Sequence, residues 1–382
     1  MDYTFYQGVK VIPGIGSVNK IGELCRDTGC KKAFIVCDQG IKQSGIADRI
    51  EKLLEKSAIE YYEYAKVVSD PPASVIDEGA QICRENNCDC VIAVGGGSAL
   101  DSAKGINILR FNPGRILDYA AKPMQVCRGL ITIPTTSGTG SELSNGAIIS
   151  DTEHNLKLPI LCANCMSEYT ILDPELTRGM PASLTMMTGL DVFSHAFEAY
   201  TAITANMMTD LVCEKIMETV IEYLPQVIKD GNNLAAREKM QAASSMGGWM
   251  LYNCCAHVGH SIAHVLGAHF HLAHGACCSY GLSNVIVEMA DTQCEKIKKT
   301  GRLFGLTFDD DISSIEIASM VANKYKEFPS ELGLKPVEDC QLQTDTLDEL
   351  VNEVVNEPFA GLAPFKVTHD VAERLLRSTL KL

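Results

Sequence analysis

The sequence lacks the features that mark membrane, secreted and nucleic-acid-binding proteins. It contains no apolar run of the roughly 18 residues that a membrane span needs, so no transmembrane helix is expected. Residues 1–10 carry charge and have no apolar core of the signal-peptide kind, which predicts a cytoplasmic protein. Lysine and arginine number only 33 against 48 aspartates and glutamates, a formal net charge of −15. This balance argues against a nucleic acid or an anionic membrane as partner.

Cysteine, by contrast, is abundant, with 16 residues. Without export these thiols are expected to be reduced. Cys88/Cys90 and Cys162/Cys165 resemble halves of a zinc ribbon, but neither pair has a second pair at ribbon spacing. They are therefore expected to be buried or partly buried thiols.

The first part of the chain alternates short β-branched runs with longer amphipathic ones. At 382 residues, 46% of them hydrophobic and 21% charged, a globular chain of about two domains is expected. The pattern predicts strands at Val9–Ile12, Ala33–Cys37, Glu60–Val67, Cys90–Val94 and Leu130–Ile133. It predicts helices at Val18–Cys30, Ile46–Lys56 and Ser74–Asn87. Such alternation is typical of a parallel sheet with helices on both faces.

Beyond Pro174 the pattern becomes helical, and no convincing strand follows. Helices are predicted at Thr188–Tyr200, Asp210–Lys229, Ala235–Leu251, Gln293–Leu303, Ser313–Glu327, Leu347–Val355 and Val371–Ser378. The chain is therefore expected to divide into an α/β domain at residues 1–180 and an all-α domain at residues 181–382.

Histidine is concentrated in Cys254–Gly275, which holds six of the nine in the chain. On a helix, Asp191 and His195 would lie one above the other, and His260 and His264 repeat this spacing. Together they offer a carboxylate and two or three imidazoles to one borderline divalent ion, Fe²⁺ or Zn²⁺. The spacing alone does not separate His260 from His264. A single histidine on an apolar helix is more often a hydrogen-bonded core residue, and this interpretation is kept for His257, His269 and His271.

A glycine loop, Gly95-Gly96-Gly97-Ser98, follows the apolar strand and opens a helix. Free backbone N–H groups at such a helix start form a cradle for a pyrophosphate. A plain turn is the alternative.

Two further segments have the chemistry of a nucleotide site. Asp38 ends a strand, where a carboxylate can accept from a ribose hydroxyl and repel a 2′-phosphate, which favours NAD over NADP. The alternative is a helix N-cap. The loop Thr135–Glu142 could hold phosphate or ribose through its hydroxyls, or it could be a solvated loop with Glu142 facing water.

Several motifs in register along nearly the whole chain together resemble the iron-containing, group III alcohol dehydrogenases. They are Gly95–Ser98 with Asp101 and Lys104, the Thr135–Glu142 loop, Gly189-Leu190-Asp191 with His195-Ala196 and Glu198-Ala199-Tyr200, and His260 through His264 to His274-Gly275. The resemblance implies a dehydroquinate synthase-like fold, an α/β dinucleotide-binding domain followed by an all-α metal-binding domain.

The resemblance also implies roles for single residues. The metal ligands correspond to Asp191, His195, His260 and His274, and His264 becomes a supporting or catalytic histidine. The cofactor-binding residues correspond to Asp38, Gly95, Gly96, Gly97, Ser98, Asp101, Thr135, Thr136 and Thr139. The implied cofactors are Fe²⁺, with Zn²⁺ possible, and NAD, and the implied assembly is a homodimer or larger homo-oligomer.

The activity implied by the resemblance is NAD-linked oxidation of an alcohol or reduction of an aldehyde, with hydride passing to or from C4 of the nicotinamide. No lysine or arginine occurs between Gly179 and Glu214 or from Met240 to Glu295, which favours small uncharged alcohols, diols or their aldehydes. The alternatives are a metal-dependent lyase of the dehydroquinate synthase type and a non-catalytic binder of metal and nucleotide.

Overall fold

The computed structural model describes residues 3–154, 156–161, 163–340 and 347–382. The chain forms two compact units. An α/β unit contains Tyr6–Met180 and Asn232–Tyr252, and a helical unit contains Met1–Phe5, Pro181–Gly231 and Asn253–Leu382. Of the cysteines considered for a zinc ribbon, Cys162 lies outside the described residues, and Cys88, Cys90 and Cys165 are buried.

The α/β unit is built on a parallel sheet in the order β1-β8-β5-β4-β2-β3. Its strands are β1 (Lys10–Pro13), β2 (Lys32–Asp38), β3 (Glu60–Val67), β4 (Cys90–Gly95), β5 (Leu130–Pro134) and β8 (Tyr169–Leu172). The central strand β4 is buried along its whole length, as expected for a strand covered on both faces.

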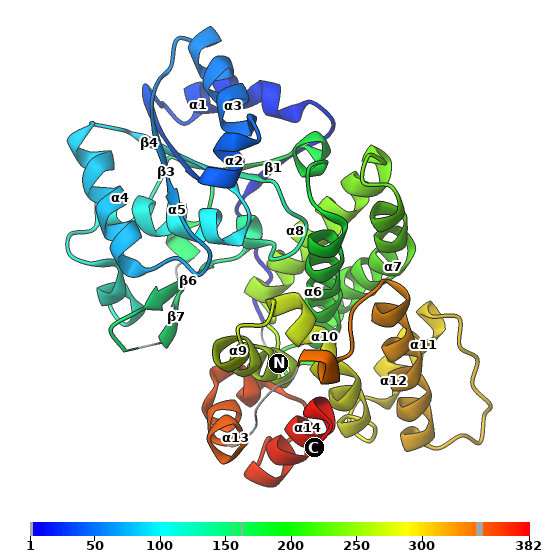
Figure 1. Cartoon of the computed structure of the whole chain (residues 1–382). Helices are drawn as coiled ribbons and strands as arrows, with labels where there is room; N and C mark the ends of the chain where they lie inside the picture. Colours follow the sequence, from blue (N-terminus) through cyan, green and yellow to red (C-terminus); the bar gives the residue numbers. More distant parts are fainter. Residues whose placement is uncertain (1–2, 155, 162, 341–346) are drawn as a thin grey trace. The chain divides into compact units, whose positions relative to one another are not determined.

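Helices cover both faces of this sheet, because successive strand residues point to opposite sides. On one face Phe34 and Val36 of β2 join a core with α4 and α5, and on the other Ala33 and Ile35 join a core with α1 and α3. Figure 1 shows this layering in the α/β unit. The helices are α1 (Ile21–Asp27), α2 (Gln39–Gln43), α3 (Ile46–Lys56), α4 (Ala73–Glu85), α5 (Gly97–Phe111) and α8 (Leu234–Asn253). The predicted fold class is confirmed.

The α/β unit also contains an antiparallel pair that the sequence did not reveal, β6 (Gly146–Asp151) and β7 (Leu156–Leu161). Ala147 and Ile149 are buried, but Ile148 between them is 41% exposed. Because both faces of β6 carry apolar residues, the alternation that marks a half-buried strand is missing.

The helical unit contains no strand within the part of the chain that the structure describes. Its helices are α6 (Ala182–Thr201), α7 (Met207–Lys229), α9 (Val258–Phe270), α10 (His274–Glu288), α11 (Cys294–Leu303), α12 (Ser314–Glu331), α13 (Leu347–Asn356) and α14 (His369–Leu380). Helix α10 is central, because it packs against α6, α9, α12 and α14.

Helix α3 and strand β3 begin and end at the residues predicted, but the helix predicted at Val18–Cys30 is wrong in its first and last turns. A separate 3₁₀ turn occupies Ser17–Lys20 before α1 begins. The Asp173 carboxylate accepts hydrogen bonds from the backbone N–H groups of Gly16 and Val18, at 3.1 and 3.2 Å. This long-range contact fixes the start of the turn, and the local sequence pattern does not predict it.

Helix α8 belongs by its contacts to the α/β unit, although it was expected in the domain of residues 181–382. A Cβ atom added to Gly248 would lie 1.8 Å from the backbone oxygen of Gly140, so α8 and the loop after β5 meet backbone to backbone. Gln241 of α8 also donates to the Pro134 carbonyl at 3.2 Å. The expected division at 180/181 is therefore one of several points where the chain passes between units.

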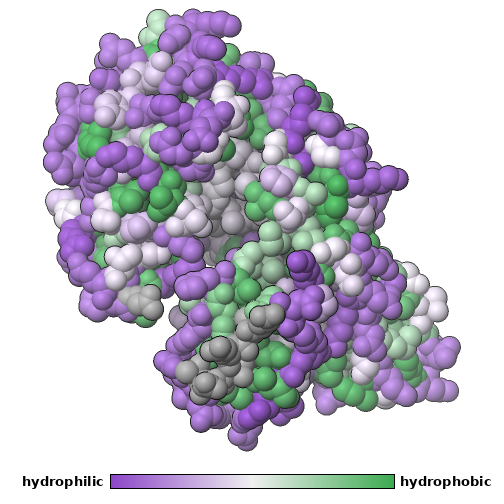
Figure 2. Space-filling model, in the orientation of Figure 1, coloured by the Kyte–Doolittle hydropathy of each residue, from purple (hydrophilic) through white to green (hydrophobic). Residues whose placement is uncertain are grey.

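Hydrophilic residues cover most of the face of the α/β unit that Figure 2 shows, as expected when charged and polar side chains stay at the surface of a globular unit. Among the described helices, none combines enough length with enough apolar character to cross a membrane.

We expect the Gly248→Ala variant to lose about 3 kcal/mol of unfolding free energy, at the upper end of typical overpacking costs. Helix propensity alone would favour alanine by about 1 kcal/mol, but the added methyl would collide with the Gly140 carbonyl. Urea unfolding followed by circular dichroism measures the change.

Gly267→Ala is the matched control, since Gly267 is also helical and its added Cβ would lie 3.7 Å from the nearest heavy atom, the Leu272 carbonyl oxygen. This variant should be unchanged or more stable. A Gly248→Ala variant at least as stable as the unchanged chain would show that the backbone contact between α8 and the loop is not required.

Candidate functional site

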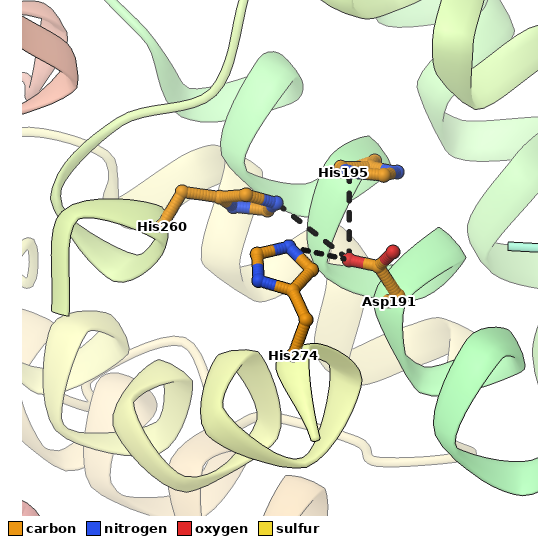
Figure 3. A group of neighbouring side chains, drawn as sticks. All are labelled: Asp191, His195, His260 and His274. Carbon is orange, nitrogen blue, oxygen red and sulfur yellow. Dashed lines mark ion pairs between the residues drawn. The ribbon is translucent and has the colours of Figure 1, made fainter. Parts of the chain in front are cut away.

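Four side chains of the helical unit bring one donor atom each into a common cluster: Asp191, His195, His260 and His274. Asp191 Oδ1 lies 3.4 Å from His195 Nε2, 3.7 Å from His260 Nε2 and 3.5 Å from His274 Nε2 (Figure 3). Donor atoms about 2.1 Å from one tetrahedral ion lie about 3.4 Å from one another. The cluster therefore has the spacing of a shell around a single metal ion.

Two glycines allow the helices that carry these donors to come this close. A Cβ atom on Gly275 would lie 1.9 Å from the Met187 carbonyl oxygen, so the start of α10 touches the backbone of α6. A Cβ atom on Gly259 would lie 2.6 Å from the Glu198 carboxylate. Each glycine is next to a histidine of the cluster, and Gly259 also makes room for Glu198, which contacts His260.

The protonation states of Asp191 and His195 suit a divalent cation, whereas His260 must first lose a proton. Burial lowers the pKa of His195 to about 4, so this imidazole is neutral at physiological pH. Burial acts to raise the pKa of Asp191, but the facing imidazoles of His195 and His274 hold it far below its usual range. Neutral imidazoles and an ionised carboxylate are the forms that bind metals. Burial acts to lower the pKa of His260, but the neighbouring Cys278, Glu198 and Asp191 raise it above its usual value, so this imidazole must lose a proton when an ion binds. The residues present therefore fit the metal that the sequence predicted.

Glu198 holds one of these imidazoles in place. Its buried carboxylate lies 2.6 Å from His260 Nδ1 and accepts hydrogen bonds from the backbone N–H groups of His257 and His260. Burial acts against the charge, but the neighbouring imidazoles of His260 and His257 and these hydrogen bonds lower the pKa of Glu198 to about 2. The carboxylate thus fixes Nδ1 of His260 and turns Nε2 toward Asp191.

His264 lies outside the donor cluster. Its Nδ1 is 3.0 Å from Glu357 Oε1, and its ring stacks on that of His274 with centroids 5.4 Å apart. The His264 side chain is 34% exposed. The structure thus separates His260 from His264, which the helical spacing could not do.

Two other histidines of this segment, His257 and His269, have partners of their own. His257 is buried with Nε2 2.9 Å from the Thr201 hydroxyl, and His269 pairs with Glu353. His271 ends α9 in a left-handed conformation, with φ at 52°.

In the α/β unit the glycine loop joins β4 to α5. Gly95 has φ at 148°, and a Cβ atom there would lie 2.7 Å from Cβ of Ala99, so only glycine fits. Within the described residues, no side chain caps the start of α5, which leaves its first N–H groups available for an anion.

The second predicted loop lies directly against this one. Added Cβ atoms on Gly96 and Gly97 would lie 3.3 Å from the Thr136 side chain and 2.8 Å from the Thr139 side chain. Thr135 N–H donates to the Gly95 carbonyl at 3.0 Å. The structure therefore brings Gly95, Gly96, Gly97, Ser98, Thr135, Thr136 and Thr139 into one region.

Asp101 makes its contacts within the protein. Its carboxylate accepts from the Ser141 hydroxyl at 2.5 Å and from the Ile148 N–H at 2.9 Å, and Lys104 lies 3.8 Å away. These contacts favour a role in positioning the loop over direct contact with a cofactor.

The alternative in which Glu142 faces water is wrong. Glu142 is buried and accepts a hydrogen bond from Ser245 of α8. Because the backbones of Gly140 and Gly248 are in close contact, this loop packs against α8 and Glu142 is kept from water.

Asp38 caps a helix, and this leaves one of its oxygens available. Oδ1 accepts from the Ile41 N–H at 2.8 Å, as an N-cap of α2. Oδ2 lies on the side of the glycine loop, 3.8 Å from where a Cβ of Gly95 would be. Both sequence interpretations of Asp38 therefore remain compatible with the geometry.

Two acidic side chains at the site, Glu198 and Glu357, were not identified as functional from the sequence. Glu198 could have been identified from the sequence, because Asp191, His195 and Glu198 follow one another at spacings of four and three on one helix face. Glu357 comes from a distant segment before a 3₁₀ turn, Pro358–Leu362, and has no such signal.

Comparisons with known proteins agree with the site. Residues 8–174 match the family "Iron-containing alcohol dehydrogenase", and residues 185–380 match "Fe-containing alcohol dehydrogenase family, C-terminal". The chain is 32% identical to a choline dehydrogenase of Bacillus subtilis over 365 residues, which cover 93% of this chain and 90% of that protein. It is 33% identical to an NAD-dependent methanol dehydrogenase of Bacillus methanolicus over 346 residues, 86% of this chain and 89% of the relative.

Solved structures agree as well. A 1,3-propanediol oxidoreductase superposes with a TM-score of 0.95 at 26% identity, over 99% of this chain and 100% of the other. A sulfoacetaldehyde reductase from Bifidobacterium kashiwanohense in complex with NAD⁺ superposes with a TM-score of 0.90 at 25% identity, over 100% of this chain and 99% of the other.

We expect Glu198→Gln to weaken zinc binding by about 10- to 100-fold, the usual cost of removing the carboxylate that orients a metal-binding histidine. Competition titration against a chelator measures the affinity. Glu222→Gln, at an exposed position of α7, is the control and should bind as tightly as the unchanged chain. Equal affinity in the two variants would show that Glu198 does not support His260 in metal binding.

Proposed function

This chain belongs to the iron-containing alcohol dehydrogenase family and interconverts alcohols and aldehydes with iron and NAD as cofactors, and we propose that its substrates are small, uncharged primary alcohols, diols or the corresponding aldehydes. The observation that carries the assignment is the cluster of one carboxylate and three imidazoles. We assign the metal to Asp191, His195, His260 and His274.

The absence of lysine and arginine from the two stretches that supply the donors supports an uncharged substrate. All four donors come from Gly179–Glu214 and Met240–Glu295, and these stretches contain no lysine or arginine. A substrate phosphate or carboxylate normally needs such a partner. The relatives include enzymes named for methanol and 1,3-propanediol, but also for choline and sulfoacetaldehyde, so the family name alone does not fix the charge of the substrate.

A bound divalent ion supplies Lewis-acid chemistry, which makes it easier for the alcohol to lose its proton as hydride leaves. The residues of the chain do the rest. Asp191 and three imidazoles hold the ion, and Glu198 fixes the orientation of His260. His274, whose side chain is 42% exposed, forms the accessible side of the cluster.

The α/β unit supplies the cofactor site. We assign the pyrophosphate to Gly95, Gly96, Gly97 and Ser98 at the start of α5, where N–H groups and the helix dipole favour an anion. We assign Thr135, Thr136 and Thr139 to the same cofactor, since their loop lies against these glycines. Asp101 positions that loop by accepting a hydrogen bond from Ser141, and it also accepts one from the Ile148 N–H group.

We also propose that the enzyme acts in the cytoplasm as a homodimer or larger homo-oligomer on a small-molecule substrate. Its 16 cysteines suit a reducing compartment.

The function is tested by adding methanol, ethanol, 1-propanol or 1,3-propanediol to iron-loaded protein with NAD⁺ and measuring reduced nicotinamide. We expect stoichiometric formation of NADH, and reversal with the aldehyde. His274→Ala, which removes one donor, should reduce turnover by at least about 100-fold. A metal-dependent lyase would return its NAD⁺ unreduced, and a non-catalytic binder would produce no NADH. A higher kcat/KM for a phosphorylated or hydroxy-acid substrate than for every simple alcohol would contradict the proposed substrate class.

Asp38→Asn should raise the preference for NADP over NAD by roughly tenfold, equivalent to about 1.4 kcal/mol. Asparagine keeps an oxygen that can cap α2 but removes the charge that repels a 2′-phosphate. Asp38→Ala, by contrast, should also cost about 1 kcal/mol of stability through the lost cap. The ratio of kcat/KM for the two cofactors is the measurement, and an unchanged ratio in Asp38→Asn would leave capping as the role of this residue.

We propose His264 as the group that passes the alcohol proton to solvent, since it stacks on His274 and is partly exposed. His264→Gln should keep its metal and lose about 100-fold in kcat, the usual scale of positioned proton transfer. His269→Gln, on the same helix and also paired with a glutamate, is the matched control. Retained metal with unchanged kcat and pH profile in His264→Gln would exclude this role.

A further inference from the structure

Three cysteines gather at the amino-terminal edge of the parallel sheet. Cys25 lies in the last turn of α1, Cys30 precedes β2, and Cys90 is the first residue of β4. Their sulfur atoms all lie within 4.8 Å of one another. All three side chains are buried, and the most exposed of them, Cys30, is only 6% exposed. The group therefore surrounds one point inside the α/β unit with sulfur.

The backbone brings the first two thiols together. Cys30 N–H donates to the Cys25 carbonyl at 2.8 Å, and Gly29 has φ at 75°. This is the Schellman ending of a helix, in which the side chains at these two positions commonly make an apolar contact. Such a contact accounts for a pair of buried thiols, but it does not require a third.

Cys90 joins this pair from a different element. Strands β2 and β4 are neighbours in the sheet, with Ala33 paired to Cys90. Cys90 packs in the same core as Cys25 and Cys30, whereas Cys88 packs in the core on the opposite face of the sheet. Cys88 and Cys90 therefore do not act as a pair, and the thiol neighbours of Cys90 come from α1 and the turn that follows it.

A second helix ending of the same kind provides an internal comparison. At the end of α4, Cys88 N–H donates to the Cys83 carbonyl at 3.0 Å, and Asn87 has φ at 54°. Cys83 and Cys88 thus occupy the positions that Cys25 and Cys30 occupy at the end of α1. Among the described residues, no third metal-binding side chain joins Cys83 and Cys88. The group of three sulfurs is therefore more than the usual contact at a helix end.

We propose that Cys25, Cys30 and Cys90 together bind one Cu⁺ ion. Three sulfurs about 2.3 Å from an ion in their plane lie about 4.0 Å from one another, which agrees with the observed grouping. Thiolates select soft ions such as Cu⁺ and Zn²⁺. Structural zinc almost always has four ligands, and the described residues add no fourth donor to this group, which favours Cu⁺. As the sulfur–copper bonds form, the three S–H bonds break and their protons leave to solvent, while copper keeps its oxidation state.

This site lies apart from the residues assigned to the cofactor. Cys90 begins β4, and Gly95 of the glycine loop ends it. Five residues of strand, at about 3.3 Å each, place these two positions about 16 Å apart. Copper binding at the amino-terminal edge is therefore independent of the proposed function.

Competition for Cu⁺ tests the site. The unchanged chain should withhold one equivalent of Cu⁺, added without oxygen as its acetonitrile complex, from the coloured chelator bicinchoninate. Cys90→Ala should lower copper affinity by at least about 100-fold, because loss of a residue that only supports a ligand already costs about 10- to 100-fold. Cys83→Ala, at the matching helix end, is the control and should bind copper as tightly as the unchanged chain. Asp191→Ala should also bind copper as tightly, since it alters only the donor cluster of the helical unit. Equal affinity in Cys90→Ala and the unchanged chain would overturn the proposal.

X-ray absorption of the unchanged chain with one equivalent of Cu⁺ avoids any question about the folding of a variant. We expect three sulfur neighbours at about 2.3 Å. A shell that contains nitrogen, or only two sulfurs, would overturn the proposal, and so would release of all the copper to the chelator. None of these results would alter the formation of NADH by the iron-loaded protein, so the proposed function is tested separately.

Discussion

One buried carboxylate oxygen shared among three imidazoles is the interaction on which the site depends. Asp191 Oδ1 lies within 3.7 Å of three histidine nitrogens that come from three helices, α6, α9 and α10. His195 and His260 are buried, so a ring nitrogen of either that lacks a partner at this point would be costly, and a cation there supplies the partner. The packing of α10 against α6 and α9 is therefore best understood together with the ion that these helices hold.

Glycine residues set how closely backbones approach in both units. Gly275 lets α10 touch α6, Gly259 makes room for Glu198, and Gly140 meets Gly248 where the loop after β5 lies on α8. In each case a single methyl group would occupy space already taken by a carbonyl, an amide or a carboxylate. These glycines have no reactive side chain, yet they determine where the functional side chains can lie.

Much of the fold and of the site could be predicted from local sequence patterns. The apolar run of β4, the amphipathic repeat of α3 and the spacing of Asp191 and His195 depend on neighbours in sequence, so a single sequence reveals them. The assignment of His260, and not His264, to the cluster depended on a family resemblance. Glu357, the Asp173 contact with Gly16 and the position of α8 could not be predicted, because each depends on a residue more than 90 positions away.

The path of the chain through its two units has a consequence for biosynthesis. The α/β unit takes α8 from residues 232–252, after the chain has already built α6 and α7 of the helical unit. On the ribosome the nucleotide-binding half cannot complete its packing until that helix has left the exit tunnel, and by then part of the second half has been translated. Because each unit is built from several segments of the chain, a single cut cannot separate the two units. We therefore expect the two units to fold together and not one after the other.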